Sequence, residues 1–73
     1  MSPKRYAIIV ERGPTSYGAD SPDLPGCAVV GESEQEVRQL IAEAMEFHIE
    51  GLKLRGEPVP EPASSVDYVE VAA

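Results

Sequence analysis

The stretch SPDLPGCAVVGESEQEV, residues 21–37, decides the fold. Its first part is stiff, because Pro22 and Pro25 lack a backbone N–H and hold φ at about −65°. Gly26, which follows them, can adopt a positive φ. Its second part, CAVVG at 27–31, is rich in β-branched residues and predicts a strand. The stretch therefore predicts a shaped loop, then a strand, and then the start of a helix.

Ser33 begins the most regular element. Ser33 and Glu36 fit a capping box, in which the serine hydroxyl accepts from the third helical N–H and the glutamate reaches back. Apolar residues then recur at spacings of three and four, which predicts one amphipathic helix that ends near Arg55 and Gly56. The stripe expected to face the core is Val37, Leu40, Ile41, Ala44, Met45, His48 and Leu52, widened by Phe47, Ile49 and Leu54.

The flanking segments predict further strands. KRYAIIVER, residues 4–12, is β-rich with apolar residues on both faces, which favours a central position in a sheet. Residues 16–21 predict a weaker strand, in which Gly18 suggests a bulge or the close approach of another backbone. Residues 57–65 contain alternating prolines and are expected to be extended with little pairing. VDYVEV at 66–71 predicts a last strand.

This order predicts an α+β fold. It is a β-β-β-α-β two-layer sandwich, with one helix packed on a small, mainly antiparallel sheet. A chain of 73 residues is expected to form a single domain, residues 1–73. So short a chain buries only about 60% of its unfolded surface. Because an open sheet edge also invites pairing, we predict a homodimer.

The charge is acidic and uneven. Asp and Glu number 13 against 6 Lys and Arg, a formal net charge of −7, and the whole excess lies after Gly31. This balance opposes direct binding to nucleic acid and favours a basic partner. The alternative is that the acids only keep a helix face in water. The segment MSPKRYAIIVERG has too short an apolar run for a signal peptide, and no stretch approaches a membrane span. We expect a cytoplasmic protein.

Several of these motifs together resemble one family. The pattern Tyr6-x-Ile8-x-Val10-Glu11, the loop SPDLPGC at 21–27 and AEAMEFHIEGLKLRGEPVPEPAS at 42–64 resemble the HicB family of antitoxins. The similarity is greatest to the N-terminal, partial RNase H-like domain of that family. The resemblance implies a partner, a HicA-type toxin, which is a small basic ribonuclease. Family members usually carry a C-terminal DNA-binding module, and after residues 66–71 no basic recognition helix is found, so operator binding is not expected.

Three functions are open at this point. The first is an antitoxin-like module that covers the RNA-binding and catalytic surface of a toxin. The second is a stand-alone structural or adaptor oligomer of the same fold without a toxin. The third is a minimal RNase H-like nuclease, which would need three or four converging carboxylates on the sheet and helix. Because Glu11, Asp67 and Glu70 lie scattered, the third is disfavoured.

Catalytic, metal and cofactor sites are not expected. Asp20 and Asp23 are expected to bond to nearby N–H groups of the turn. His48 falls in the apolar stripe and is expected to be buried and hydrogen-bonded. Cys27 has no CxxC or histidine companion, and we expect it to pack as a small apolar residue.

The loop PDLPG is the candidate partner-binding edge. Two prolines reduce the entropy lost on association, so Leu24 could be held outward as an apolar anchor. The alternative is a rigid connector that only fixes strand register. The candidate partner-binding residues are Pro22, Asp23, Leu24, Pro25 and Gly26 of the loop and Glu43, Glu46 and Glu50 of the helix.

Overall fold

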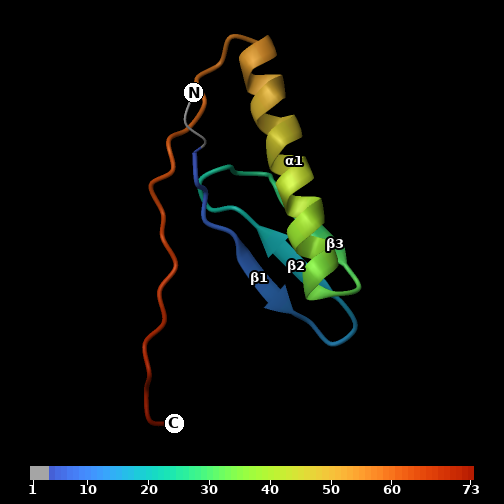
Figure 1. The fold of residues 1–73 in the computed structure, drawn as a ribbon, viewed down its shortest axis with the longest axis vertical. Coiled ribbons are helices and arrows are strands. Elements are labelled where there is room, and N and C mark those ends of the chain that lie inside the picture. The colour runs from blue at the N-terminus through green and yellow to red at the C-terminus, as the bar shows by residue number, and fades with distance from the viewer. Residues whose placement is uncertain (1–3) are drawn as a thin grey trace.

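The computed structural model describes residues 4–73. Three strands, β1 (Ile9–Arg12), β2 (Tyr17–Asp20) and β3 (Ala28–Gly31), precede one helix, α1 (Glu34–Leu54). Both strand pairs are antiparallel, and the order in the sheet is β1-β2-β3. The helix lies across one face of this sheet (Figure 1). The α+β class, the antiparallel sheet and the single packed helix are confirmed.

The core lies between this face of the sheet and the helix. The register places Val10, Ala19 and Val29 side by side on the three strands. Ala19 forms a buried cluster with Val37 and Ile41, the residues by which the first turns of α1 meet the sheet. Successive strand residues point to opposite faces, so one face is packed and the other lies in water.

β1 departs from its prediction in length and position. It pairs only over Ile9–Arg12, and it is an edge strand rather than the central one. The apolar residues on its second face misled the prediction, because a single helix covers only one side, and Ile9 is 41% exposed. Gly18 pairs regularly with Glu11 and Val30, so the expected bulge is absent as well.

The start of α1 is capped as predicted, with one shift. The Ser33 Oγ accepts a hydrogen bond from the Glu36 N–H at 3.1 Å. The Glu36 carboxylate reaches back to the N–H of Glu32, at 3.3 Å, one residue earlier than a capping box requires. Both bonds satisfy backbone groups at the helix start that have no partner within the helix.

Ser33→Ala is expected to lower the free energy of unfolding by about 1 kcal/mol, because it leaves a helical N–H without its side-chain acceptor. Urea unfolding followed by circular dichroism at 222 nm measures the change. Ser33→Asp keeps an acceptor oxygen at the same place and should stay close to the parent. Equal stability of the alanine and aspartate variants would show that the cap does not act.

The end of α1 reverses the chain. The N–H groups of Gly56 and Glu57 donate to the carbonyls of Lys53 and Leu52, at 3.1 and 2.9 Å. This is the bonding of a Schellman motif. It requires a left-handed residue, and Gly56 has φ +69°. The predicted helix end is thereby confirmed.

Two residues of the predicted stripe are wrong. Phe47 and Leu54 are largely exposed, at 79% and 82%. Each residue advances about 100° around the helix axis. This rotation places both side chains on a side of the helix turned away from Val37 and Ile41. Ile49 is half-buried as expected.

The last predicted strand is absent. Residues 58–73 run extended, past the open side of β1, and form no strand within the described part of the chain (Figure 1). Pro58, Pro60 and Pro62 supply no N–H to any ladder. Residues 57–65 thus behave as predicted, whereas 66–71 has strand propensity but no strand beside it.

Candidate functional site

The PDLPG loop, Pro22–Gly26, consists of two successive turns. The Leu24 N–H donates to the Ser21 carbonyl at 3.2 Å, and the Cys27 N–H donates to the Leu24 carbonyl at 3.1 Å. In the second turn Pro25 precedes Gly26, whose φ of +86° is the value that a type II turn needs at this place. The Ser21 N–H then closes the loop on the Cys27 carbonyl at 3.3 Å. The loop is therefore a closed, rigid connection between β2 and β3.

Leu24 does not project outward. Its side chain is fully buried, with 0% exposure, while Pro22, Pro25 and Gly26 around it are exposed. The prediction of an apolar anchor at Leu24 is wrong. Closing the loop turns the one large apolar side chain inward, because burying it gains about 2 kcal/mol of transfer free energy.

Asp23 holds a segment far away in the sequence. Its carboxylate accepts hydrogen bonds from the N–H groups of Ala63 and Ser64, at 3.1 and 3.0 Å, and from the Ser64 hydroxyl at 3.0 Å. We call this group of contacts the Asp23 clamp. The expectation that Asp23 bonds to nearby turn groups is wrong, because the hydrogen bonds of its carboxylate go to Ala63 and Ser64 instead. Donation from Ser64 and Ala63 lowers the pKa of Asp23 below its ordinary value.

Two further contacts hold the same segment. The Tyr6 hydroxyl donates to the Pro60 carbonyl, and the Lys4 ammonium pairs with the Glu61 carboxylate at 2.7 Å. The ion pair is largely in water and contributes little on its own. Together with the Asp23 clamp, these contacts fix residues 60–64 beside the N-terminal segment.

Acidification is expected to release residues 63–64. A folded-state pKa below the ordinary 3.8 means that the clamp stabilises the attached state above that pH. This stabilisation is lost as pH falls below 3.8 and passes the folded-state pKa. Hydrogen exchange of the Ala63 and Ser64 amides, followed by NMR from pH 6 to pH 2.5, should accelerate beyond the intrinsic pH dependence in this window.

Asp23→Ala should show the fast exchange already at pH 6. Asp20→Ala removes a carboxylate just before the same loop and serves as the matched control, with exchange like the parent. Slow exchange in Asp23→Ala would contradict the clamp.

The acidic face of α1 lies opposite the core. Glu43, Glu46 and Glu50 are all exposed, and their spacing of three and four places them along one side of the helix. Phe47 lies next to this side, one residue after Glu46 and three before Glu50. We call these four residues the acidic face. The sequence analysis missed Phe47 as a surface residue, although its angular distance from the centre of the apolar stripe was a signal.

One end of the PDLPG loop meets this helix. A small cavity of about 280 Å³ is bordered by Gly26 and Cys27 on the loop side and by Phe47 and His48 on the helix side. Gly26 is thus brought near the acidic face. Asp23 is occupied by the clamp and Leu24 by the interior, so the predicted partner-binding residues do not form one patch.

Cys27 and His48, the remaining candidates, show no arrangement typical of a catalytic or metal site in the described part of the chain. Cys27 is buried, as predicted, and burial raises the pKa of its thiol, which disfavours the reactive thiolate. His48 is half-buried, and within residues 4–73 its imidazole has no hydrogen-bond partner, contrary to expectation. Among the described residues no three His, Cys, Asp or Glu side chains lie together as a metal site would need.

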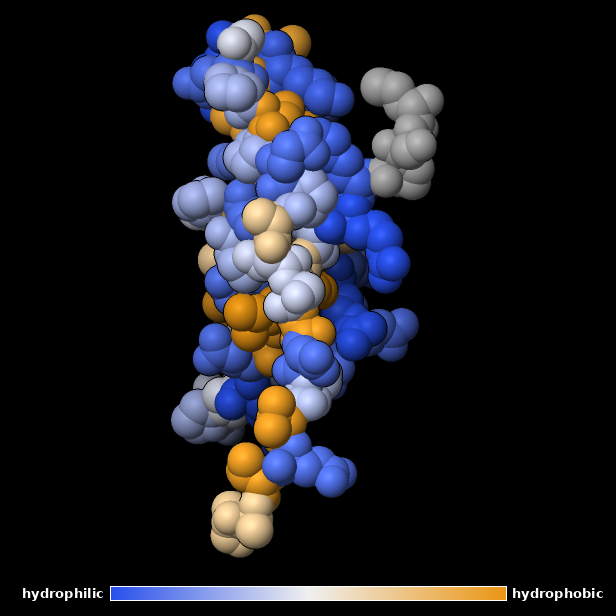
Figure 2. Space-filling model, turned by 90° about the vertical axis from the view of Figure 1, so that its left-hand side faces the viewer, coloured by the Kyte–Doolittle hydropathy of each residue, from blue (hydrophilic) through white to orange (hydrophobic). Residues whose placement is uncertain are grey.

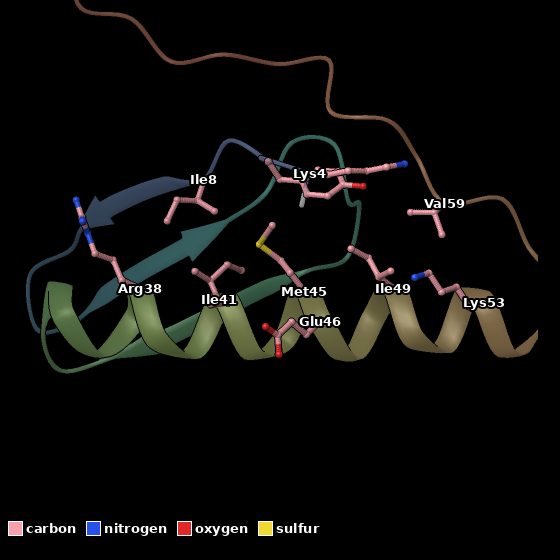
Figure 3. A pocket seen from close by; sticks show the side chains of 11 residues that line it. Lys4, Ile8, Arg38, Ile41, Met45, Glu46, Ile49, Lys53 and Val59 are labelled. Carbon is pink, nitrogen blue, oxygen red and sulfur yellow. The ribbon is translucent and has the colours of Figure 1, made fainter. Parts of the chain in front are cut away.

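An apolar groove of about 770 Å³ runs between α1, the N-terminal segment and residue 59. Ile41, Met45 and Ile49 of the helix point into it, toward Ile8 and Val59 (Figure 3). Its rim carries the cations Lys4, Arg38 and Lys53 and the acid Glu46. Its walls are the half-buried margin of the core.

No helix in the described part of the chain has the length and apolar character that a membrane crossing requires.

A family model described as "HicB_like antitoxin of bacterial toxin-antitoxin system" matches residues 6–72. An uncharacterised 14.9 kDa protein from the rep-hol intergenic region of Haemophilus phage HP1 is 33% identical over 64 residues. The match covers 88% of this chain and 48% of that protein. A UPF0150 protein of Synechocystis is 36% identical over 64 residues, which is 82% of this chain and 81% of that one. The chain thus spans about half the length of the phage protein.

Proposed function

Because the chain belongs to the HicB-like antitoxin family of bacterial toxin-antitoxin systems, we propose that it neutralises a HicA-type toxin. Such a toxin is a small basic ribonuclease, and the chain would act by covering the toxin's RNA-binding and catalytic surface. The role is non-catalytic, and its place is the cytoplasm, where the toxin meets RNA. The protein acts as a homodimer.

The acidic face of α1 is the observation that carries this proposal. Three exposed carboxylates on a capped, rigid helix present a negative potential that is complementary to a basic RNA-binding surface. Phe47 beside them offers an exposed aromatic ring, the kind of side chain that anchors protein interfaces. Gly26 of the PDLPG loop, exposed near Phe47, would border the contact, with the exposed Pro25 next to it in the chain. Leu24 is buried beneath the loop and Asp23 is engaged in the clamp, so neither is expected to touch the toxin.

The direct test is an RNA cleavage assay with a purified HicA-type toxin, for which a short basic reading frame beside this gene would be the first candidate. Cleavage should fall in proportion to added protein and end near stoichiometric amounts, because the antitoxin occupies the RNA site. The protein alone should leave the RNA intact. Undiminished cleavage in the presence of excess protein would refute the proposal, and so would metal-dependent cleavage by the protein itself.

Changing Glu43, Glu46 and Glu50 together to glutamine is expected to slow association with the toxin by about ten-fold at low salt. The slope of log k against log salt should flatten too, because long-range attraction is removed while contacts remain. Stopped-flow mixing at two salt concentrations measures both effects.

The matched control changes Glu11 and Glu32 to glutamine and Asp20 to asparagine, which removes the same charge from other surfaces. It should keep most of the parent's association rate. If both triple variants slowed association equally, net charge and not the acidic face would steer the encounter.

A further inference from the structure

The chain after the Asp23 clamp is an extended segment with strand propensity and, within the described residues, no strand beside it. Residues 66–71 read VDYVEV, contain no proline and consist of β-branched or aromatic residues and two acids. Tyr68 is 90% exposed and Val69 82%. In Figure 2 the chain protrudes from the lower end of the body, with apolar (orange) atoms next to polar (blue) ones. We call residues 66–71 the tail strand. Apolar, β-prone surface that stays in water marks a site of association.

The outer side of β1 is an open sheet edge, with which an extended segment could pair. β2 covers one side of β1, and in the described part of the chain no strand pairs with its other side. One row of backbone N–H and C=O groups on Ile9–Arg12 therefore lacks a strand partner in a single copy. The open side faces toward the tail strand (Figures 1 and 3).

A gap separates this edge from the tail strand of the same copy. A cavity of about 660 Å³ is bordered by Ile9 and Val10 on one side and by Val66 and Tyr68 on the other. The Asp23 clamp and the Tyr6 contact to Pro60 hold the beginning of the tail on the far side of this gap. In Figure 1 the tail runs in the same direction as β1. The chain thus leaves an unoccupied gap between β1 and its own tail strand.

We propose that the tail strand of a second copy of this chain enters this gap, and that the two copies exchange tails around a two-fold axis. The axis passes between the two tails, perpendicular to the sheet. The strand order becomes β3-β2-β1, tail of the partner, own tail, and then β1-β2-β3 of the partner. Each tail thereby fills the other copy's gap, so the arrangement closes as a dimer. The inference rests on the homodimer proposed above and is independent of the toxin.

The strand directions agree with this arrangement. A two-fold axis makes the partner's tail antiparallel to the copy's own tail, and therefore antiparallel to β1. The enlarged sheet then continues the antiparallel pairing of β1, β2 and β3. Pairing of a tail with its own β1 would instead be parallel, and the clamp would have to give up its hold on Ala63 and Ser64.

The charges around the gap also favour the exchange of tails. Arg12 and Arg38 border the gap, with Glu34 as the one acid on that side. Glu34 already lies 3.5 Å from Arg38, whereas Arg12 has no ion pair within residues 4–73. The entering tail strand carries Asp67 and Glu70 and no base. The lining of the gap on the β1 side therefore carries two cations against one acid where the tail is acidic, and apolar residues of both surround these charges.

Mixed-label NMR of the full chain is the primary test. A sample refolded from equal amounts of isotope-labelled and unlabelled protein should show intermolecular NOEs between residues 66–71 and residues 8–12. Sedimentation equilibrium should give a dimer. A monomer at millimolar concentration would overturn the exchange together with the homodimer. A dimer whose intermolecular NOEs lie elsewhere would overturn the exchange alone, and neither result would bear on toxin inhibition.

Val69→Pro is the matching variant, because it removes an N–H and stiffens the tail strand without touching the folded body. It should raise the dimer dissociation constant by roughly ten-fold or more. Ala72→Pro places the same residue just after the tail strand and should dimerise like the parent. Equal dissociation constants for the two variants would overturn the proposal. Unchanged helix content in circular dichroism shows that neither variant unfolds.

Discussion

Leu24→Ala is expected to lower the free energy of unfolding by about 3 kcal/mol. Leu24 is the only large apolar side chain of the PDLPG loop and is fully buried, so its truncation leaves a cavity that two hydrogen-bonded turns cannot collapse to fill. For a domain of this size the loss is a large part of the total stability. Urea unfolding, measured by circular dichroism, gives the change.

Leu54→Ala makes the same substitution at a site that is 82% exposed and is the matched control. Its effect should stay within about 0.5 kcal/mol. In the toxin assay, folded Leu24→Ala protein, kept below its unfolding transition, should associate and dissociate like the parent. A stability change as small as that of Leu54→Ala would mean that Leu24 is not packed. A shortened complex lifetime would restore it as a contact residue.

Phe47→Ala is expected to cost about 2 kcal/mol of binding free energy to the toxin, which corresponds to about thirty-fold faster dissociation. The ring lies beside the glutamates of the acidic face and is mostly in water in the free protein, so its burial would occur only in the complex. Stability should change little, because the ring makes few contacts within the chain. Surface plasmon resonance with immobilised toxin measures the dissociation rate.

Val30→Ala is the control for an alternative docking site. Val30 is the most exposed large apolar side chain on the uncovered face of the sheet, at 70%. It should leave the toxin's dissociation rate unchanged. A large effect of Val30→Ala with none of Phe47→Ala would move the interface from the helix to the sheet.

The local signals of the sequence were sufficient for most of the fold. The serine cap, the spacing of apolar residues and Gly56 predicted the helix to within a residue at each end, because these features act within one or two helical turns. The loop prolines and Gly26 predicted the turn between β2 and β3 for the same reason. Interactions of such short range can be predicted from a single sequence.

The errors concern what covers each surface. Ile9 and Leu24 are both apolar, yet the first is in water and the second is buried, because only the number and placement of layers decides this. Asp23 reaches Ser64 across 41 residues of sequence, and no local pattern announces that contact. The hydrophobicity of Phe47 predicts a core position, whereas its angular position on the helix predicts the exposed one that it has.

The Asp23 clamp also bears on the order in which the chain folds. β1, β2, β3 and α1 follow one another through short connections, so most of their contacts join neighbours in sequence, and a low contact order favours rapid folding. The contacts of residues 60–64, the clamp among them, must wait for loops of 40 to 57 residues to close, at an entropic cost that grows only with the logarithm of loop length. The body should therefore form first and residues 60–64 attach afterwards.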